Sequence, residues 1–349
     1  QVVDRVSSHI RFWGEQQGYF ASKGDADTFQ DELSYLLINQ YAAFNSPVFF
    51  NVGLSHKYSI LGDKPSGNWI YDSKKDEVVP AEDSYSRPQG SACFIQSVED
   101  DLTLMMDLLK SESRIFKYGS GSGTNFSSIR GIGEKLSGGG FSSGLISWLR
   151  VYDANAGATK SGGTTRRAAK MVILNYDHPE IKEFIEWKAR GEELVGILTA
   201  AGIGGDFEGE AYQNVSGQNS NNSVRVTDEF MRGIDNEDAY FETINRTDGK
   251  IRERIKNKDL MNRIAQAAWR SADPGMQFHD NVNLWNPCIN TDQINASNPC
   301  SEYMFVDDSA CNLASTNLLK FLKENGKFDV HGFKHANRII MTAQEILVG

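Results

Sequence analysis

Near the start of the chain, hydrophobic residues recur every three or four positions, as they do on one face of a helix. The first stripe consists of Val3, Val6, Ile10 and Trp13, and a second helix is predicted from about Asp27 to Phe44. We expect this helix to end before Pro47, because proline disfavours helical backbone at the residue before it. Residues 54–90 are polar and turn-rich, which predicts an exposed loop or insertion.

From Ser91 onward, short apolar runs alternate with longer helical patterns. This alternation predicts an α/β architecture with parallel strands. The predicted strands cover residues 92–95, 170–174, 223–226, 276–278 and 302–306. The predicted helices cover residues 97–117, 144–154, 178–190, 228–234, 258–271, 315–323 and 335–348.

Composition narrows the classes of function. The chain has 349 residues, a formal charge of −10 and 40% hydrophobic residues, and it contains no apolar run long enough for a membrane span. The acidic balance argues against a general nucleic-acid or anionic-membrane surface. Four cysteines in a chain with no signal-like start favour a reducing cytosol. The start at Gln1 and the stop at Gly349 suggest a piece of a longer chain.

The segment 298–302, Asn-Pro-Cys-Ser-Glu, is the first candidate for chemistry. In an extended chain Asn298, Cys300 and Glu302 would point to one face. Each would lie about 7 Å from the next, because they stand two residues apart. An amide, a thiol and a carboxylate would then share a surface where simple packing requires hydrophobic residues. The alternative is a turn with a buried cysteine.

The other cysteines divide into two groups. A turn at Asp307-Asp308-Ser309 would let the chain return and bring Cys311 near Cys300. Cys93 stands at a strand start after small residues and is either an accessible thiol or a core cysteine, and Cys288 is interpreted as structural. The spacings contain no Cys-x-x-Cys motif, so a zinc site is disfavoured and thiol redox chemistry is favoured.

Two glycine-rich segments suggest phosphate contacts. Residues 117–125 let the backbone approach an anion, but they match neither a P-loop nor Gly-x-Gly-x-x-Gly. Residues 161–167 place two arginines beside flexible glycines, which suits a loop that contacts a nucleotide. The alternative for the second segment is a solvated basic turn.

Together these segments resemble the catalytic subunit of ribonucleotide reductase, most closely its adenosylcobalamin-dependent class II branch. The most specific stretches are NPCSEY at 298–303 and DDSACNLASTNL at 307–318. The other matching stretches, in family order, are FNSPVFFN at 44–51, SACF at 91–94, KYGSGSGTNFSSIR at 117–130, SGGTTRRAAKM at 161–171, HPEIKEFIEWK at 178–188 and NNSVRVTDEFM at 221–231.

The resemblance implies a ten-stranded α/β barrel, of which this chain would be the first part. Residues 1–90 would form a helical N-terminal region and residues 91–349 would begin the barrel, with a finger loop inside. Cleavage of the cobalt–carbon bond of adenosylcobalamin would produce a thiyl radical at Cys300, which would abstract the ribose 3′-hydrogen. Glu302 would accept the 3′-hydroxyl proton, and Asn298 would hold the sugar hydroxyls. Cys93 and Cys311 would reduce the 2′ position and become a disulfide.

The resemblance also implies binding residues and partners. A ribonucleotide, dNTP control, a thioredoxin-like reductant and a possible homodimer are expected, whereas direct nucleic-acid or membrane binding is not. The effector and specificity residues would be Arg130, Gly162, Gly163 and Arg166. The substrate contacts would be Ser46, Ala92, Cys93, Gly121, Asn298, Pro299, Cys300, Ser301 and Glu302.

Three alternatives stay open. A class I large subunit would take its radical from a separate metal-containing subunit. A glycyl-radical enzyme is disfavoured because all three chemical cysteines and Glu302 are present. A non-catalytic nucleotide-binding fragment would keep Arg130 and residues 161–167 but use no thiol. The sequence has no segment like an ATP-cone, a later phosphate loop or a C-terminal cysteine pair, so this chain alone is expected to be inactive.

Overall fold

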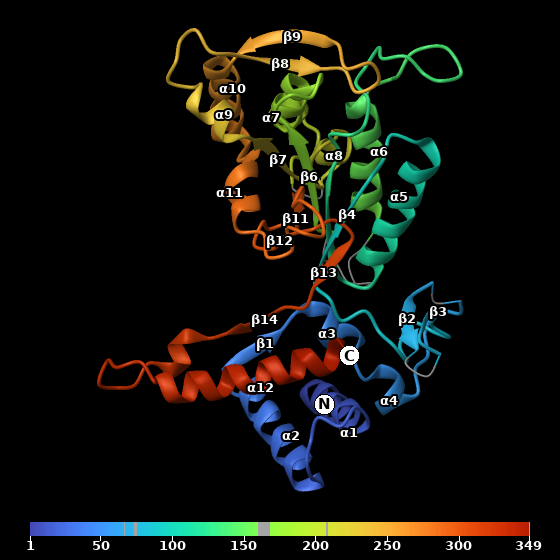
Figure 1. Ribbon diagram of the computed structural model, residues 1–349, viewed down its shortest axis with the longest axis vertical. Helices are drawn as coiled ribbons and strands as arrows, with labels where there is room; N and C mark the ends of the chain where they lie inside the picture. Colours follow the sequence, from blue (N-terminus) through green and yellow to red (C-terminus); the bar gives the residue numbers. More distant parts are fainter. Residues whose placement is uncertain (66, 73–74, 160–167, 207–208, 349) are drawn as a thin grey trace. The chain divides into compact units, whose positions relative to one another are not determined.

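The computed structural model describes residues 1–65, 67–72, 75–159, 168–206 and 209–348. It divides into two compact units (Figure 1). Unit 1 combines residues 1–92 with 311–349, and unit 2 comprises residues 93–310. Residues 311–349 therefore pack with the N-terminal helices, although they follow the candidate catalytic segment in the sequence.

Unit 1 is built around the predicted helical stripes. Val6 and Ile10 of the first helix and Leu33 of the second are fully buried, and they pack with Ile340 of the last helix. The helices are α1 (Val2–Gln16), α2 (Lys23–Ile38), α3 (Ser46–Asn51), α4 (Leu54–Tyr58), the 3-10 helix η2 (Leu318–Phe321) and α12 (Val330–Val348). The strands are β1 (Ala42–Phe44), β2 (Trp69–Asp72), β3 (Glu77–Pro80) and β14 (Ala314–Thr316).

The predicted end of the second helix is wrong. Phe44 belongs to β1 and pairs with Ala314 of β14. Asn45 then caps a new helix, because its Oδ1 accepts the N–H of Val48 at 3.0 Å. Pro47 lies in the first turn of α3, where its missing N–H costs nothing.

Other boundaries in unit 1 also differ from the prediction. The region predicted as a loop, 54–90, contains α4 and the β2–β3 hairpin. The predicted helix 315–323 is replaced by β14 and η2, and the last helix begins at Val330 rather than at 335. The elements that were missed are short and lack a long periodic pattern, whereas α12 is a 19-residue helix whose start was placed too late.

Unit 2 holds a six-stranded sheet in the order β10-β7-β6-β5-β4-β13. The first five of these strands are parallel to their neighbours, which confirms the predicted α/β class. The strands of unit 2 are β4 (Cys93–Gln96), β5 (Gly121–Asn125), β6 (Lys170–Asn175), β7 (Asn221–Val226), β8 (Tyr240–Ile244), β9 (Ile251–Lys256), β10 (Gly275–Phe278), β11 (Ala296–Ser297), β12 (Met304–Phe305) and β13 (Ser309–Cys311). The helices are α5 (Leu102–Lys117), α6 (Leu145–Ala158), α7 (Ile181–Ala200), α8 (Glu210–Gln213), α9 (Asp228–Arg232), α10 (Asn257–Ser271) and α11 (His279–Leu284).

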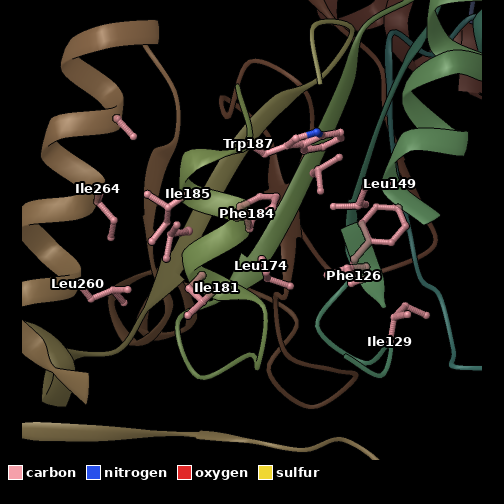
Figure 2. Close-up of a cluster of buried hydrophobic side chains, with 14 of the residues drawn as sticks. Phe126, Ile129, Leu149, Leu174, Ile181, Phe184, Ile185, Trp187, Leu260 and Ile264 are labelled. Carbon is pink, nitrogen blue, oxygen red and sulfur yellow. The ribbon is translucent and has the colours of Figure 1, made fainter. Parts of the chain in front are cut away.

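One side of this sheet, the helix face, carries the main core. Val172 and Leu174 of β6 point to it and pack against α7, where Phe184 lies in the same cluster as Leu149 of α6 and Leu260 of α10 (Figure 2). Successive residues of a strand point to opposite faces. The intervening Met171 and Ile173 therefore belong to a separate cluster on the other side.

That other side is covered by residues near the end of unit 2. Met171 and Ile173 pack with Ile95 of β4 and Ala296 of β11. We call this the hairpin face, because β11 and β12 pair antiparallel across it. Both faces of β6 are thus buried, as expected for a parallel strand between two layers.

A buried carboxylate joins the start of α6 to the segment before α7. Glu180 accepts the N–H groups of Leu145 and Ile146 in the first turn of α6, at 2.6 and 3.3 Å, and that of Ile132 at 2.9 Å. An anion is favoured there by the helix dipole. The motif His178-Pro179-Glu180 therefore holds α6 in place, and α7 itself begins at Ile181 rather than at 178. In the described parts of the chain, no helix combines the length and hydrophobicity needed to cross a membrane.

Candidate functional site

Cys300 lies at the tip of a hairpin. Residues 296–305, which we call the cysteine hairpin, contain β11 and β12 in the register Ala296 to Phe305 and Ser297 to Met304. Asn298 closes the tip twice: its N–H donates to the carbonyl of Tyr303 at 3.0 Å, and its Oδ1 accepts the N–H of Tyr303 at 2.9 Å.

The predicted extended conformation of residues 298–302 is wrong. The N–H of Ser301 bonds to the carbonyl of Asn298 at 3.1 Å, and Ser301 adopts a left-handed φ of 61°. Asn298 is fully buried, whereas Cys300 and Glu302 are exposed, so the three side chains do not share a face. The alternative of a turn was correct, but its cysteine is not buried.

The hairpin brings Asn298 to a second cysteine. The Nδ2 of Asn298 donates to the Sγ of Cys93 at 3.1 Å, and Cys93 is buried at the start of β4. Because the amide is the donor, the sulfur acts as the acceptor and the thiol proton is not used in this bond. Two residues predicted from distant motifs are therefore in direct contact.

Close contact with the cysteine hairpin explains why β5 has glycine at two positions. A Cβ built on Gly123 would lie 1.8 Å from the carbonyl oxygen of Ser297, and one on Gly121 would lie 2.8 Å from Cγ of Pro299. The hairpin thus rests directly on the backbone of β5. The Nδ2 of Asn221 on β7 adds a bond of 2.7 Å to the carbonyl of Pro299. The segment 117–125, predicted as a phosphate loop, contains a buried strand.

Cys311 ends β13 and lies within unit 1. Its carbonyl accepts the N–H of Ala92, the residue before Cys93, at 2.8 Å. The predicted return of the chain is present, because Asp308 adopts a φ of 56° between β12 and β13. Cys288 is half-buried in a separate turn, where its N–H bonds to Asn286 at 2.8 Å. Among the residues that the structure describes, no three potential ligands gather into a metal site.

The remaining predicted positions are dispersed. Ser46 is the first residue of α3 in unit 1. The Nε of Arg130 donates to Asp100 at 2.5 Å, and its Nη1 donates to the carbonyl of Lys135 at 2.9 Å. Gly162, Gly163 and Arg166 lie outside the described residues.

Sequence reasoning missed a row of buried polar side chains on the hairpin face. Arg225 of β7 and Gln277 of β10 are 2% and 1% exposed; Arg225 donates to Gln277, and Gln277 donates to Ser297 of the hairpin. A signal was available, since Ser223 and Arg225 alternate along the predicted strand 223–226, and Asn221 stands two residues before it. Polar residues at alternate positions of a buried strand indicate a hydrogen-bonded layer.

The base of the hairpin carries an unusual carboxyl. Burial raises the pKa of Asp307 to about 6, opposed by a hydrogen bond from Asn295 at 3.2 Å. Arg225 also opposes the rise, but burial dominates. Asp308 beside it accepts both the N–H and the hydroxyl of Ser97, at 3.1 and 2.7 Å, and so ties the hairpin to the end of β4.

Comparison with known proteins identifies the family. The barrel-domain model of ribonucleotide reductase matches residues 91–349, and a model described as class II vitamin B12-dependent ribonucleotide reductase matches residues 1–40. The chain therefore belongs to the ribonucleotide reductase family. Within that family it falls in the vitamin B12-dependent class II branch, which confirms the resemblance read from the motifs.

Similar proteins carry the same description. The chain is 48% identical to a vitamin B12-dependent ribonucleotide reductase of Rhodopirellula baltica, and 40% and 44% identical to those of Agrobacterium fabrum and Streptomyces clavuligerus. All three alignments cover 100% of this chain and 33% of the relative. The chain thus spans about one third of the length of the curated relatives that it matches.

Proposed function

We propose that the complete protein containing this chain reduces ribonucleotides to 2′-deoxyribonucleotides, with Cys300 as the radical-carrying thiol. One observation carries the proposal: the hairpin that exposes Cys300 is joined through Asn298 to the buried thiol of Cys93. A hydrogen-atom transfer at one carbon of a sugar and a reduction at its neighbour need two thiols within reach of one ring. The Asn298–Cys93 contact joins the hairpin that carries the thiol of Cys300 to the strand that carries the thiol of Cys93.

The residues present fit adenosylcobalamin. A corrin brings its cobalt already ligated, so what the chain must offer is a reactive group that faces the cofactor. The exposed thiol of Cys300 is that group. When bound, the cofactor would supply radical chemistry through its cobalt–carbon bond, and Cys300 would be the residue that gives up its thiol hydrogen atom.

In this proposal each step of the reaction is assigned to particular side chains. Cys300 takes the 3′-hydrogen atom and later returns it. Glu302, exposed two residues away, accepts the proton of the 3′-hydroxyl. Cys93 and Cys311 deliver two electrons and two protons, the 2′-hydroxyl leaves as water, and a disulfide forms. The sum is one ribonucleotide and two thiols converted into one deoxyribonucleotide, one disulfide and one water.

Asn298 orients this chemistry. Its amide oxygen is held by the N–H of Tyr303, so its amide nitrogen is directed at Cys93. In this proposal the thiol of Cys93 protonates the departing 2′-hydroxyl. The contact between Ala92 and Cys311 supports Cys311 as the partner, since Ala92 directly precedes Cys93.

The proposal also includes the family's barrel, its effector site and its external reductant. The six-stranded sheet would be part of a ten-stranded barrel, a dNTP effector would contact Arg130 and residues 161–167, and a thioredoxin-like dithiol would reduce the disulfide. The bond from Arg130 to Asp100 implies that an anionic effector competes with a carboxylate for this guanidinium. A homodimer remains part of the same proposal.

The decisive variant is Cys300→Ser in the complete protein. We expect deoxyribonucleotide formation, measured with adenosylcobalamin and a dithiol, to fall to the background without enzyme. dNTP binding should persist, which separates lost chemistry from lost folding. Cys288→Ser is the matched control and should keep full turnover, because Cys288 lies in a separate turn that precedes the hairpin, where its N–H bonds to Asn286. Turnover that survives Cys300→Ser would refute the proposal.

A further inference from the structure

A chain of buried hydrogen bonds crosses the hairpin face and ends at the cysteine hairpin. Arg225 Nη1 donates to Gln277 Oε1 at 3.2 Å, and Gln277 Nε2 donates to Ser297 Oγ at 2.7 Å. Ser297 Oγ lies 3.0 Å from the carbonyl oxygen of Asn298 and 3.3 Å from Ser301 Oγ. Ser297 and Asn298 are fully buried.

The direction of these bonds is set by chemistry. A guanidinium can only donate, so the amide oxygen of Gln277 must face Arg225 and the amide nitrogen must face Ser297. The Ser297 oxygen then accepts from Gln277, and its own proton is left for the carbonyl of Asn298. Gln277 therefore determines which way the Ser297 hydroxyl points.

The last acceptor of the chain lies at the centre of the tip. The Asn298 carbonyl also receives the N–H of Ser301, the residue that follows Cys300 in a left-handed conformation. The Asn298 side chain in turn donates to Cys93. One residue, Asn298, thus connects the turn around Cys300, through its backbone carbonyl, with the second thiol, through its side-chain amide.

Packing alone does not require an amide at position 277. On the same face β6 presents Met171 and Ile173, which are apolar. A buried amide stabilises a fold only when its hydrogen bonds are made, and an apolar pair of similar shape would serve packing as well. The polar side chain at position 277 is therefore better explained by a role in orienting Ser297 than by packing.

We propose that Gln277 is a positioning residue for the radical-carrying thiol: through Ser297 it holds the Asn298 carbonyl and so the turn that presents Cys300. The inference rests on the proposed function and deepens it. Gln277 is assigned no catalytic role, because it is buried and its amide bonds to Arg225 and Ser297 rather than to the exposed tip of the hairpin.

The test compares variants of the complete protein. Gln277→Met removes both bonds, and Gln277→Glu keeps the shape and the bond to Arg225 but, when ionised, cannot donate to Ser297. Ser297→Ala removes the relay from the other side. The matched control is Gln96→Met, because Gln96 of β4 bonds to the hydroxyls of Ser111 and Ser122 in unit 2.

Three measurements are made on each variant: kcat and KM for deoxyribonucleotide formation, the rate at which iodoacetamide alkylates Cys300 by mass spectrometry, and the thermal midpoint. We expect the Gln277 and Ser297 variants to lose about 10- to 100-fold in kcat, the scale of a displacement of about 1 Å, with KM within about twofold. Alkylation of Cys300 should change by at least about threefold relative to Cys288.

The double variant Gln277→Met/Ser297→Ala adds a test of coupling. It should be no slower than the slower single variant, because both act through one relay. Its thermal midpoint should fall by less than the sum of the two single losses, because the Gln277–Ser297 bond is lost only once, although Arg225 still loses its acceptor. Gln96→Met should lower the midpoint yet leave kcat and Cys300 alkylation unchanged.

The outcomes separate the two proposals. If Cys300→Ser abolishes turnover while the Gln277 variants stay within about twofold of wild-type kcat, the positioning role is overturned and the proposed function stands. A loss of kcat that only follows the folded fraction, with Cys300 alkylation unmoved, also overturns it. An active Cys300→Ser protein would overturn the proposed function itself.

Discussion

The two faces of the unit 2 sheet are built on different principles. On the helix face, Leu174 and its neighbours form a large apolar cluster between the sheet and α6, α7 and α10 (Figure 2). On the hairpin face, the apolar cluster is small, and polar side chains such as Asn221, Arg225 and Gln277 bond to the hairpin. The same strands supply both.

The difference separates stability from positioning. Apolar burial stabilises a fold in proportion to area and without direction. Hydrogen bonds add little net free energy each but fix orientation. We therefore expect substitutions on the helix face to change unfolding and those on the hairpin face to change turnover.

The largest expected effect is on the helix face, at the ion pair of Glu112 and Lys170, whose side chains are 0% and 1% exposed. Glu112→Gln leaves a buried ammonium without its carboxylate, which should lower the free energy of unfolding by about 3–5 kcal/mol. Because burial lowers the pKa of Lys170, the deficit should shrink as pH rises and the amine loses its proton. Denaturant unfolding at several pH values measures this.

A double variant, Glu112→Leu with Lys170→Met, provides the control. It should unfold close to wild type, since neither charge remains buried. A Glu112→Gln protein as stable as wild type at neutral pH would contradict the assignment of this pair to the stabilising face.

The next effect compares two neighbours on β6. Leu174 and Ile173 are both 0% exposed but belong to the helix-face and hairpin-face clusters respectively. Leu174→Ala and Ile173→Ala should each cost about 2–5 kcal/mol through the cavity they leave. Only Ile173→Ala should lower kcat per folded molecule, because Ile173 supports the cysteine hairpin. Equal kcat losses in both would break the comparison.

A smaller effect on unfolding, with a large one on turnover, is expected for Gly123→Ala. The new methyl group meets the Ser297 carbonyl, so the hairpin must shift, at a cost of about 1–3 kcal/mol. Gly196→Ala on α7 is the control, since no atom lies within 4 Å of its added Cβ, and it should stabilise by about 1 kcal/mol. Gly123→Ala with wild-type kcat would mean that the hairpin does not carry the reaction.

The smallest effect is expected for Asp307→Asn. The pKa of Asp307 is raised in the fold, so the folded state favours the neutral acid, and stability from this group is lost as pH rises from about 4 to 6. The Asp307→Asn protein should be more stable than wild type above pH 6, with the advantage vanishing toward pH 4. Thermal midpoints across pH measure this. Asp308→Asn, which weakens the bonds to Ser97, should be destabilising instead.

The sequence predicted elements well where hydrophobic periodicity is local. The strand around 170–174 and the helix 258–271 appear within one residue of their predicted limits. β5 was missed because its Gly-Ser-Gly pattern has no hydrophobic signal. The reason for Gly123 is the carbonyl of Ser297, which lies so far along the chain that no local pattern contains it.

The candidate site was predicted in its residue types but not in its geometry. Motif resemblance selected Asn298, Cys300 and Cys93, and the contact between Asn298 and Cys93 is present. The turn around Ser301 was predicted only as the alternative to an extended segment, because a left-handed serine is stabilised by surrounding contacts rather than by its own preference. Gln277 has no local signal of function, and its role depends on the register that places it beside Arg225.

Three side chains of the sheet hold the cysteine hairpin and the two residues before it by bonding to their main-chain carbonyls. Asn125 and Asn221 donate to the carbonyls of Asn295 and Pro299, and Arg225 donates to that of Ile294. Every amino acid offers such a carbonyl, whereas only a few side chains can donate from the opposite side. The freedom to vary is therefore unequal: with respect to these bonds, positions 294, 295 and 299 accept other residues, while Asn125, Asn221 and Arg225 must keep a side chain that donates.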